Sequence, residues 1–197
     1  MKKVNRLTLK IIILFFIFFN IEVNSKIVSL GAPESKVIIK VFSSLTCPAC
    51  ANFHSKIFSK LKKDFIDKGL VRFEHHPFPL DLAALNAEII LRCYVDKDKK
   101  FVLLDKIYEK QQSWAVGSDI NKINDSIKKI GLEVNLENEK MNSCLKNDKL
   151  QDEILTQRIE AQKKYKIEAT PTILINEKEY TGKVNYKEFK KTLEKNL

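Results

Sequence analysis

Apolar residues along the chain fall either in short continuous runs or in stripes of helical spacing. The run from Val37 to Phe42 has the length and β-branched content of a buried strand. Further on, an apolar residue recurs every four positions, at Phe53, Ile57, Leu61 and Phe65. Gly69 follows this stripe, as glycine often does at the end of a helix. The pattern therefore predicts a strand and then a helix that ends near residue 69.

A second strand is predicted at 70–74, where apolar and polar residues alternate. Pro77 and Pro79 then interrupt any regular element, so we expect His75 and His76 to lie in a loop. From Asp81 to about Tyr165 every apolar stripe has helical spacing, and no strand pattern occurs. This block is predicted to be an all-helical insertion.

Strand character returns at 170–175 and leads through a turn into a second short strand near residue 180. Asn185 is then placed to cap a last helix. The order is strand, helix, strand, helical block, hairpin, helix, which predicts an α/β protein with a thioredoxin fold and an inserted all-helical domain. We expect the first half of the thioredoxin fold at 26–80, the insertion at 81–166 and the second half at 167–197.

The N-terminus has the pattern of a secretory signal peptide. Basic residues precede nine consecutive apolar residues at 11–19, and a cleavage position follows near Ser25. The apolar run is short for a membrane span. We expect residues 1–25 to be removed on export; the alternative is an uncleaved N-terminal anchor.

The formal net charge of +10 does not indicate a nucleic-acid partner. The lysines are spread over the predicted helices and interleaved with glutamates, as at Lys129 and Glu133. No basic cluster with interleaved aromatic residues occurs, and nucleic-acid binding would require one. A weak attraction to anionic membrane surfaces is the most that this charge implies.

Cys47 and Cys50 are placed where the predicted strand gives way to the predicted helix. Pro48 between them suits the first turn of a helix, because its missing N–H would have no partner there. Free N–H groups and the helix dipole stabilise an anion at that position, so we expect a lowered pKa for Cys47. Cys50 lies one turn further along and is the natural resolving thiol. The alternatives are a structural disulfide or half of a zinc site.

Two further cysteines, Cys93 and Cys144, lie 51 positions apart in the predicted helical block. Export would place them in an oxidising compartment, where an even number of cysteines favours pairing. If bridged, they would close a loop worth roughly 4 kcal/mol in the chain-entropy model. The residues alone leave two buried thiols as the alternative.

The histidines raise the possibility of a metal site. Cys47 and Cys50 together with one or two of His54, His75 and His76 would have the ligand types of a zinc or copper centre. His54 lies four residues after Cys50, on the same helix face, and we expect it to be a surface or half-buried helix residue. We therefore predict no metal and no cofactor other than a redox-active Cys47–Cys50 disulfide.

Three segments resemble the DsbA-like thiol:disulfide oxidoreductases, most closely their alphaproteobacterial group. They are 44–54 around the two cysteines, 78–81 leading to Cys93, and 169–173 around Thr170 and Pro171. The resemblance implies that Cys47 is the exposed nucleophile, Cys50 its buried partner and Pro171 a cis-proline facing them. Thr170, Pro48 and Ala49 would then contact substrate, and Cys93 and Cys144 would form a second, non-catalytic disulfide.

Two positions depart from the family pattern. Val41 stands where the family usually has a buried glutamate, and Ala49 stands where it often has a histidine that stabilises the thiolate. Without that imidazole the Cys47–Cys50 couple should be less oxidising. These departures affect the direction of exchange rather than its chemistry.

The sequence predicts a periplasmic protein that exchanges disulfides with reduced or unfolded secreted proteins, most simply as a monomeric oxidase. A membrane protein would reoxidise it, or reduce it if it works in the other direction. The alternatives are a disulfide isomerase or reductase of the same fold, a thioredoxin-fold metal-binding or chaperone protein, and a form tethered to the inner membrane.

Overall fold

A five-stranded mixed sheet lies at the centre of the structure, a computed structural model that describes residues 27–197. The strand order is β1-β3-β2-β4-β5; β3 runs parallel to β2 and every other neighbouring pair is antiparallel. The predicted signal peptide, residues 1–25, lies outside the described residues. The strands are β1 (Val28–Leu30), β2 (Val37–Ser43), β3 (Val71–Pro77), β4 (Thr172–Ile175) and β5 (Lys178–Glu179).

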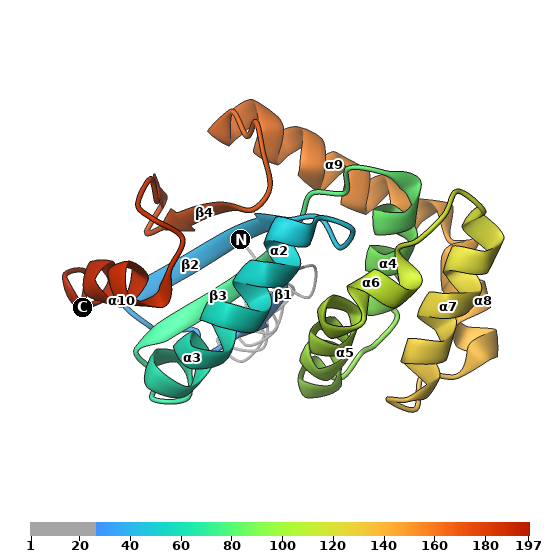
Figure 1. The fold of residues 1–197 in the computed structure, drawn as a ribbon, viewed down its shortest axis with the longest axis horizontal. Coiled ribbons are helices and arrows are strands. Elements are labelled where there is room, and N and C mark those ends of the chain that lie inside the picture. The colour runs from blue at the N-terminus through green and yellow to red at the C-terminus, as the bar shows by residue number, and fades with distance from the viewer. Residues whose placement is uncertain (1–26) are drawn as a thin grey trace, which may run out of the picture.

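A continuous helical stretch follows β2 and packs on one face of the sheet (Figure 1). It comprises α2 (Pro48–Phe53), the π-helical turn η2 (His54–Phe58), α3 (Ser59–Leu61) and the π-helical turn η3 (Lys62–Ile66). The predicted apolar stripe is buried against the inward face of β2, where Val37, Ile39 and Val41 are at most 1% exposed. Gly69 ends the stretch with a φ of 72°, a conformation that glycine adopts without strain.

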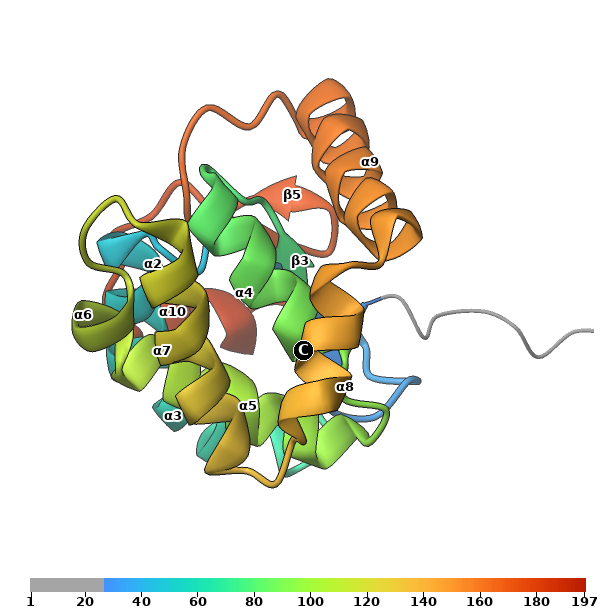
Figure 2. The same cartoon turned by 90° about the vertical axis from the view of Figure 1, so that its right-hand side faces the viewer.

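The helices between β3 and β4 form a block beside the sheet, seen from its own side in Figure 2. They are α4 (Leu82–Arg92), α5 (Lys97–Glu109), α6 (Gln111–Trp114), α7 (Ile120–Leu132), α8 (Asn138–Leu145) and α9 (Asp148–Tyr165). α10 (Tyr186–Glu194) returns to the sheet, with Asn185 as its N-cap, as predicted. The predicted fold class, a thioredoxin fold with a helical insertion, is confirmed.

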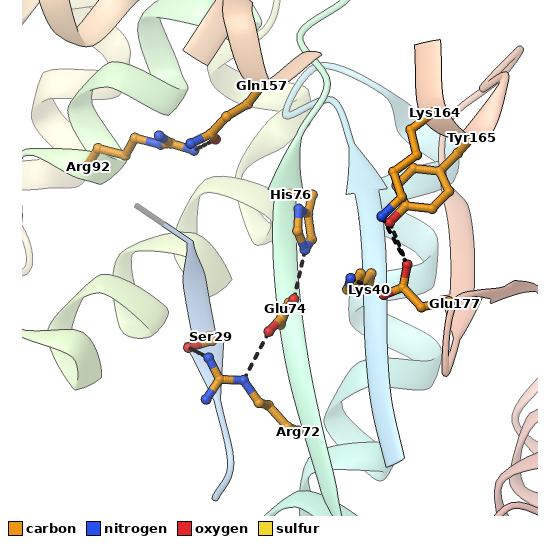
Figure 3. Close-up of polar contacts among 10 residues, drawn as sticks. All are labelled: Ser29, Lys40, Arg72, Glu74, His76, Arg92, Gln157, Lys164, Tyr165 and Glu177. Carbon is orange, nitrogen blue, oxygen red and sulfur yellow. Dashed lines mark hydrogen bonds and ion pairs between the residues drawn. The ribbon is translucent and has the colours of Figure 1, made fainter. Parts of the chain in front are cut away.

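The outward face of the sheet carries a row of polar side chains that satisfy one another (Figure 3). Arg72 Nε donates to Glu74 Oε1 at 3.0 Å, and Glu74 Oε2 lies 2.9 Å from His76 Nε2. These residues alternate along β3 and therefore share one face. The C-terminal half of α9 covers part of this face, where Tyr165 contacts the ring of Phe42. Within residues 27–197, no helix is both long and apolar enough to cross a membrane.

Two features of the sheet differ from the sequence prediction. The short strand β1 was not predicted, because three residues are too few to show a periodicity. His75 and His76 lie in β3 rather than in a loop, and His75 is only 1% exposed. Pro77 is tolerated at the end of the strand because the next residue, Phe78, donates its N–H to Ser43 O at 2.8 Å.

Candidate active site

Cys47 and Cys50 lie at the first turn of α2, directly after the loop that leaves β2. Cys47 is the N-cap residue, with extended backbone angles, and Pro48 is the first helical residue. Cys47 is half-buried, and Pro48 and Ala49 are exposed beside it. Cys50 points inward and is only 1% exposed. Both sulfurs are free thiols, so one sulfur can meet a partner molecule while the other is shielded.

Thr170 and Pro171 lie opposite the two cysteines, although they are at least 120 positions away in the sequence. The Thr170–Pro171 peptide bond is cis. The Cys47 thiol donates to the carbonyl oxygen of Thr170 at 3.3 Å. The Thr170 hydroxyl is buried and makes no hydrogen bond of its own, which leaves it available to donate to a thiolate at Cys47.

The two thiols differ in acidity. Burial acts to raise the pKa of Cys47, but the Thr170 side chain, the backbone at Ala49 and Cys50 and the Cys50 thiol outweigh it, so that this pKa is lowered. Burial and the negative charge of Cys47 raise the pKa of Cys50 to about 12. Near neutral pH, Cys47 is therefore the thiolate former and Cys50 stays protonated.

The loop before Cys47 is held by contacts with the helical block. Thr46 Oγ1 donates to Asp81 Oδ2 at 2.7 Å, and the other oxygen of Asp81 caps α4 by accepting from Ala84 N–H. Gln111 on α6 is 4% exposed, and its side-chain amide donates to Leu45 O at 2.8 Å and to Cys47 O at 3.0 Å. Gln111 was not predicted from the sequence, because nothing distinguishes a buried glutamine from the exposed one at 112.

Replacing Gln111 with leucine is expected to lower the free energy of unfolding by about 1–3 kcal/mol, because the buried carbonyl of Leu45 and the half-buried carbonyl of Cys47 each lose a donor. Urea unfolding measures this change. Gln112→Leu is the matched control, since Gln112 is exposed on the same short helix. An equal loss in both variants would contradict a specific role for the Gln111 amide.

The remaining cysteines and histidines singled out in the sequence have partners of their own. Cys93, the C-cap residue of α4, is joined to Cys144 on α8 by a disulfide, with a Cα–Cα distance of 6.1 Å. His54 is buried at 7% exposure against Asp105, contrary to the surface or half-buried position expected. His75 is paired with Glu88. Within residues 27–197, no group of three or more His, Cys, Asp or Glu side chains is placed to hold a metal ion.

Two thiols of unequal acidity at one helix end are the groups that dithiol–disulfide exchange requires. The fold and the site therefore define a thioredoxin-class redox protein. The family model described as Thioredoxin matches residues 23–195, and the chain belongs to that family.

Known relatives show which kind of thioredoxin-class redox protein this chain is. "Disulfide bond formation protein D" of Bacillus subtilis is 34% identical over 180 residues, which cover 85% of this chain and 76% of the relative. A "Putative protein-disulfide oxidoreductase" of Rickettsia bellii is 30% identical over 162 residues; the match covers 82% of this chain but only 61% of that relative. The chain is a DsbA-like thiol:disulfide oxidoreductase.

Solved structures agree with this assignment. Wolbachia pipientis alpha-DsbA1 superimposes with a TM-score of 0.80 at 26% identity, over 87% of this chain and 91% of that one. Oxidised BdbD from Bacillus subtilis gives a TM-score of 0.77 at 26% identity, over 87% and 92% of the two chains. The likeness extends over both the thioredoxin elements and the helical insertion.

Proposed function

We propose that this protein is a disulfide donor for secreted proteins and that Cys47 and Cys50 carry the exchange. The observation that carries the proposal is the contrast between the half-buried Cys47, whose pKa is lowered, and the shielded Cys50, whose pKa is raised to about 12. A stabilised thiolate favours the reduced form of the pair, and a protein whose reduced form is stabilised is an oxidant of its substrates.

The exchange runs in two steps. A substrate thiolate attacks the sulfur of Cys47 in the disulfide form; a substrate–Cys47 bond forms, and the Cys47–Cys50 bond breaks with its electron pair on Cys50. The second thiolate of the substrate then attacks the substrate sulfur of this mixed disulfide, and Cys47 leaves as a thiolate. The substrate gains a disulfide, and this protein gains two electrons and is reduced.

Thr170 and Pro171, together with Pro48 and Ala49, form the proposed substrate-binding surface around Cys47. Pro48 and Ala49 are exposed in the first turn, so a bound chain can reach Cys47 over them. The Thr170 backbone offers hydrogen bonds to an extended substrate chain. Its hydroxyl is the group best placed to stabilise the Cys47 thiolate after the mixed disulfide has been resolved.

The partners and location follow the same proposal. The substrates are reduced or unfolded proteins that have been exported, and a membrane protein reoxidises Cys47 and Cys50 after each turnover. Residues 1–25 would direct the chain to the periplasm, where it would work as a monomer without a cofactor. The names of the relatives, disulfide bond formation protein and protein-disulfide oxidoreductase, support this role.

One observation favours the opposite direction of exchange, in which the protein acts as a reductase or isomerase. Ala49 supplies no charge or hydrogen-bonding side chain to the Cys47 thiolate, so the thiolate depends on Thr170, Cys50 and backbone N–H groups. A less stabilised thiolate gives a less oxidising pair.

The equilibrium of Cys47 and Cys50 with glutathione buffers tests the direction. We expect a potential nearer to about −120 mV than to about −270 mV, the values of a strong disulfide donor and of thioredoxin. Thr170→Val should make the potential more negative by roughly 30 mV or more, because one hydrogen bond to a charged group is worth about 1.5 kcal/mol or more.

Thr172→Val is the matched control, because the Thr172 hydroxyl bonds to Ala169 O at 2.7 Å and not to either cysteine. A potential near that of thioredoxin would favour the reductase or isomerase. Absence of any exchange with glutathione would overturn the assignment of Cys47 and Cys50.

A further inference from the structure

A cavity of about 390 Å³ opens where the edge strand β1 meets the end of α4 and the start of α5. Three basic side chains line it, those of Arg92, Lys97 and Lys100, and none of the lining residues that the structure describes is acidic. Its apolar surface comes chiefly from Val28, Tyr94, Val95 and Phe101. The cavity therefore combines an apolar wall with a concentration of positive charge.

This cavity lies away from the redox pair. α4 begins after its N-cap Asp81, whose side chain holds Thr46 in the loop before Cys47, and it ends at Arg92. Its 11 residues place Arg92 about 16 Å further along the helix axis. The disulfide exchange proposed above uses none of the residues that line the cavity.

The two lysines bring positive charge that no protein group balances. Neither the Lys97 nor the Lys100 ammonium forms a hydrogen bond or an ion pair with another residue in the range 27–197. Lys100 is half-buried, and burial together with the charges of Arg92 and Lys97 lowers its pKa, although the charge of Glu88 acts the other way. Like charges held close together at a half-buried position are unfavourable unless an anion balances them.

Arg92 adds hydrogen-bond donors to the cavity rather than net charge. Its Nε donates to Glu88 Oε1 at 3.1 Å, and its Nη2 donates to Gln157 Oε1 of α9 at 2.7 Å (Figure 3). Glu88 is 2% exposed, and its carboxylate balances the charge of Arg92. A guanidinium has five N–H donors, so donors that these two contacts do not use can bind an anion.

Ser29 of β1 supplies a hydroxyl donor to the same cavity. Its Oγ accepts a hydrogen bond from Arg72 Nη2 at 3.1 Å, and that bond does not use the proton of the hydroxyl. Tyr94 differs, because its hydroxyl donates to Val134 O and its ring is left to line the cavity. The donors of the cavity are therefore Ser29, Arg92 and the two lysines.

We propose that this cavity binds a phosphate group, held by the two lysine ammonium groups with Arg92 and Ser29 as further donors. A phosphate monoester carries a charge of about −1.5 to −2 near neutral pH, which matches the two unbalanced positive charges, whereas a carboxylate would balance only one of them. The cavity has room for more than the phosphate, and its apolar wall can receive an apolar group esterified to it. Such a ligand is either a phospholipid headgroup or a free phosphate ester.

Titration with inorganic phosphate at constant ionic strength tests the site, with NMR of isotope-labelled protein as the readout. We expect saturable shifts in β1 and at the start of α5. Lys100→Gln should weaken binding about tenfold or more, because one hydrogen bond to a charged group is lost, and Lys100→Arg should retain most of it. Lys99→Gln is the matched control, since Lys99 is exposed on the same helix and does not line the cavity. It should change the affinity by less than about twofold.

Flotation with phosphatidylcholine vesicles, prepared with and without phosphatidate, distinguishes the two sources of phosphate. A lipid headgroup predicts a preference for phosphatidate that is weakened in Lys100→Gln and in Val95→Ser, because Val95 is 90% exposed beside the cavity. Val95→Ser should leave the titration with inorganic phosphate unchanged. A free phosphate ester predicts saturable phosphate binding without any preference for phosphatidate.

Absence of saturable phosphate binding would overturn the proposal. So would equal weakening in Lys100→Gln and Lys99→Gln, because the general attraction of a chain with a net charge of +10 would then account for the binding. Exchange of Cys47 with glutathione should stay at the native rate in each variant, which reports that the fold is intact. If Lys100→Gln does not fold, Lys97→Gln provides the same test, because Lys97 is the more exposed of the two lysines.

Discussion

Replacing Cys50 with serine is expected to turn the protein into a trap for its substrates. Cys47 keeps its half-buried position and the Thr170 side chain that helps to lower its pKa, so it still attacks disulfides. Cys50 can no longer resolve the resulting mixed disulfide, so it accumulates with a substrate that carries a single thiol. Exchange through the Cys47–Cys50 pair should fall by at least about a thousandfold, as expected when one member of a unit that acts together is removed.

Cys47→Ser should lose the same activity without trapping anything. Cys50 is 1% exposed and its pKa is raised to about 12, so it is neither accessible nor ionised near neutral pH. Non-reducing gel electrophoresis with a test protein that carries a single thiol, in the presence of glutathione disulfide, separates the two outcomes. Trapping by Cys47→Ser but not by Cys50→Ser would show that the roles of the two cysteines are reversed.

The pH dependence of trapping follows from the lowered pKa of Cys47. The thiolate is the reacting species, and its fraction decreases only as the pH drops through that pKa. An ordinary cysteine, with a reference value of 9.0, is mostly protonated at neutral pH. Trapping by Cys50→Ser should therefore weaken only at a lower pH than the reaction of a thiol with an ordinary pKa.

Local signals in the sequence predicted the fold and the position of the redox pair. The apolar run of β2, Pro48 in the first helical turn and Gly69 at the end each act within a few residues of the feature they specify. The hairpin after Pro171 is also specified locally, because Asn176 and Glu177 adopt the positive φ values that its turn needs. Such features can be predicted from the sequence because they depend on the backbone angles that a few neighbouring residues favour.

Buried polar partners could not be predicted in the same way. His75, Glu88 and Gln111 have side chains that usually lie at the surface, and only tertiary packing buries them. Glu88 lies on α4 between apolar residues, and the sequence does not show that the fold brings His75 next to it. His75 was placed in a loop because Pro77 follows it, and the pairing of β3 with both β1 and β2 outweighs that signal.

Removing the second disulfide is expected to have the largest effect on stability. Cys93 and Cys144 are 51 positions apart, and a loop of that size restricts the unfolded chain by about 4 kcal/mol in the chain-entropy model. The double variant Cys93→Ala/Cys144→Ala should lose roughly that free energy of unfolding, measured with urea. Alanine is preferable to serine because Cys93 is only 5% exposed, and a hydroxyl there would need a partner.

The same variant shows whether the helical block must be held together for exchange to occur. The disulfide joins the end of α4 to α8, whereas the contacts that hold the Cys47 loop come from Asp81 at the start of α4 and Gln111 on α6. We therefore expect the activation free energy of adduct formation at Cys47 to change by less than about 0.4 kcal/mol. The rate should then remain within about twofold of that of the native protein under conditions where the variant is folded. A large loss of rate in a variant that is as stable as the native protein would contradict this and show that α8 controls Cys47. An unchanged free energy of unfolding would show that the unfolded chain gains little freedom when the disulfide is removed.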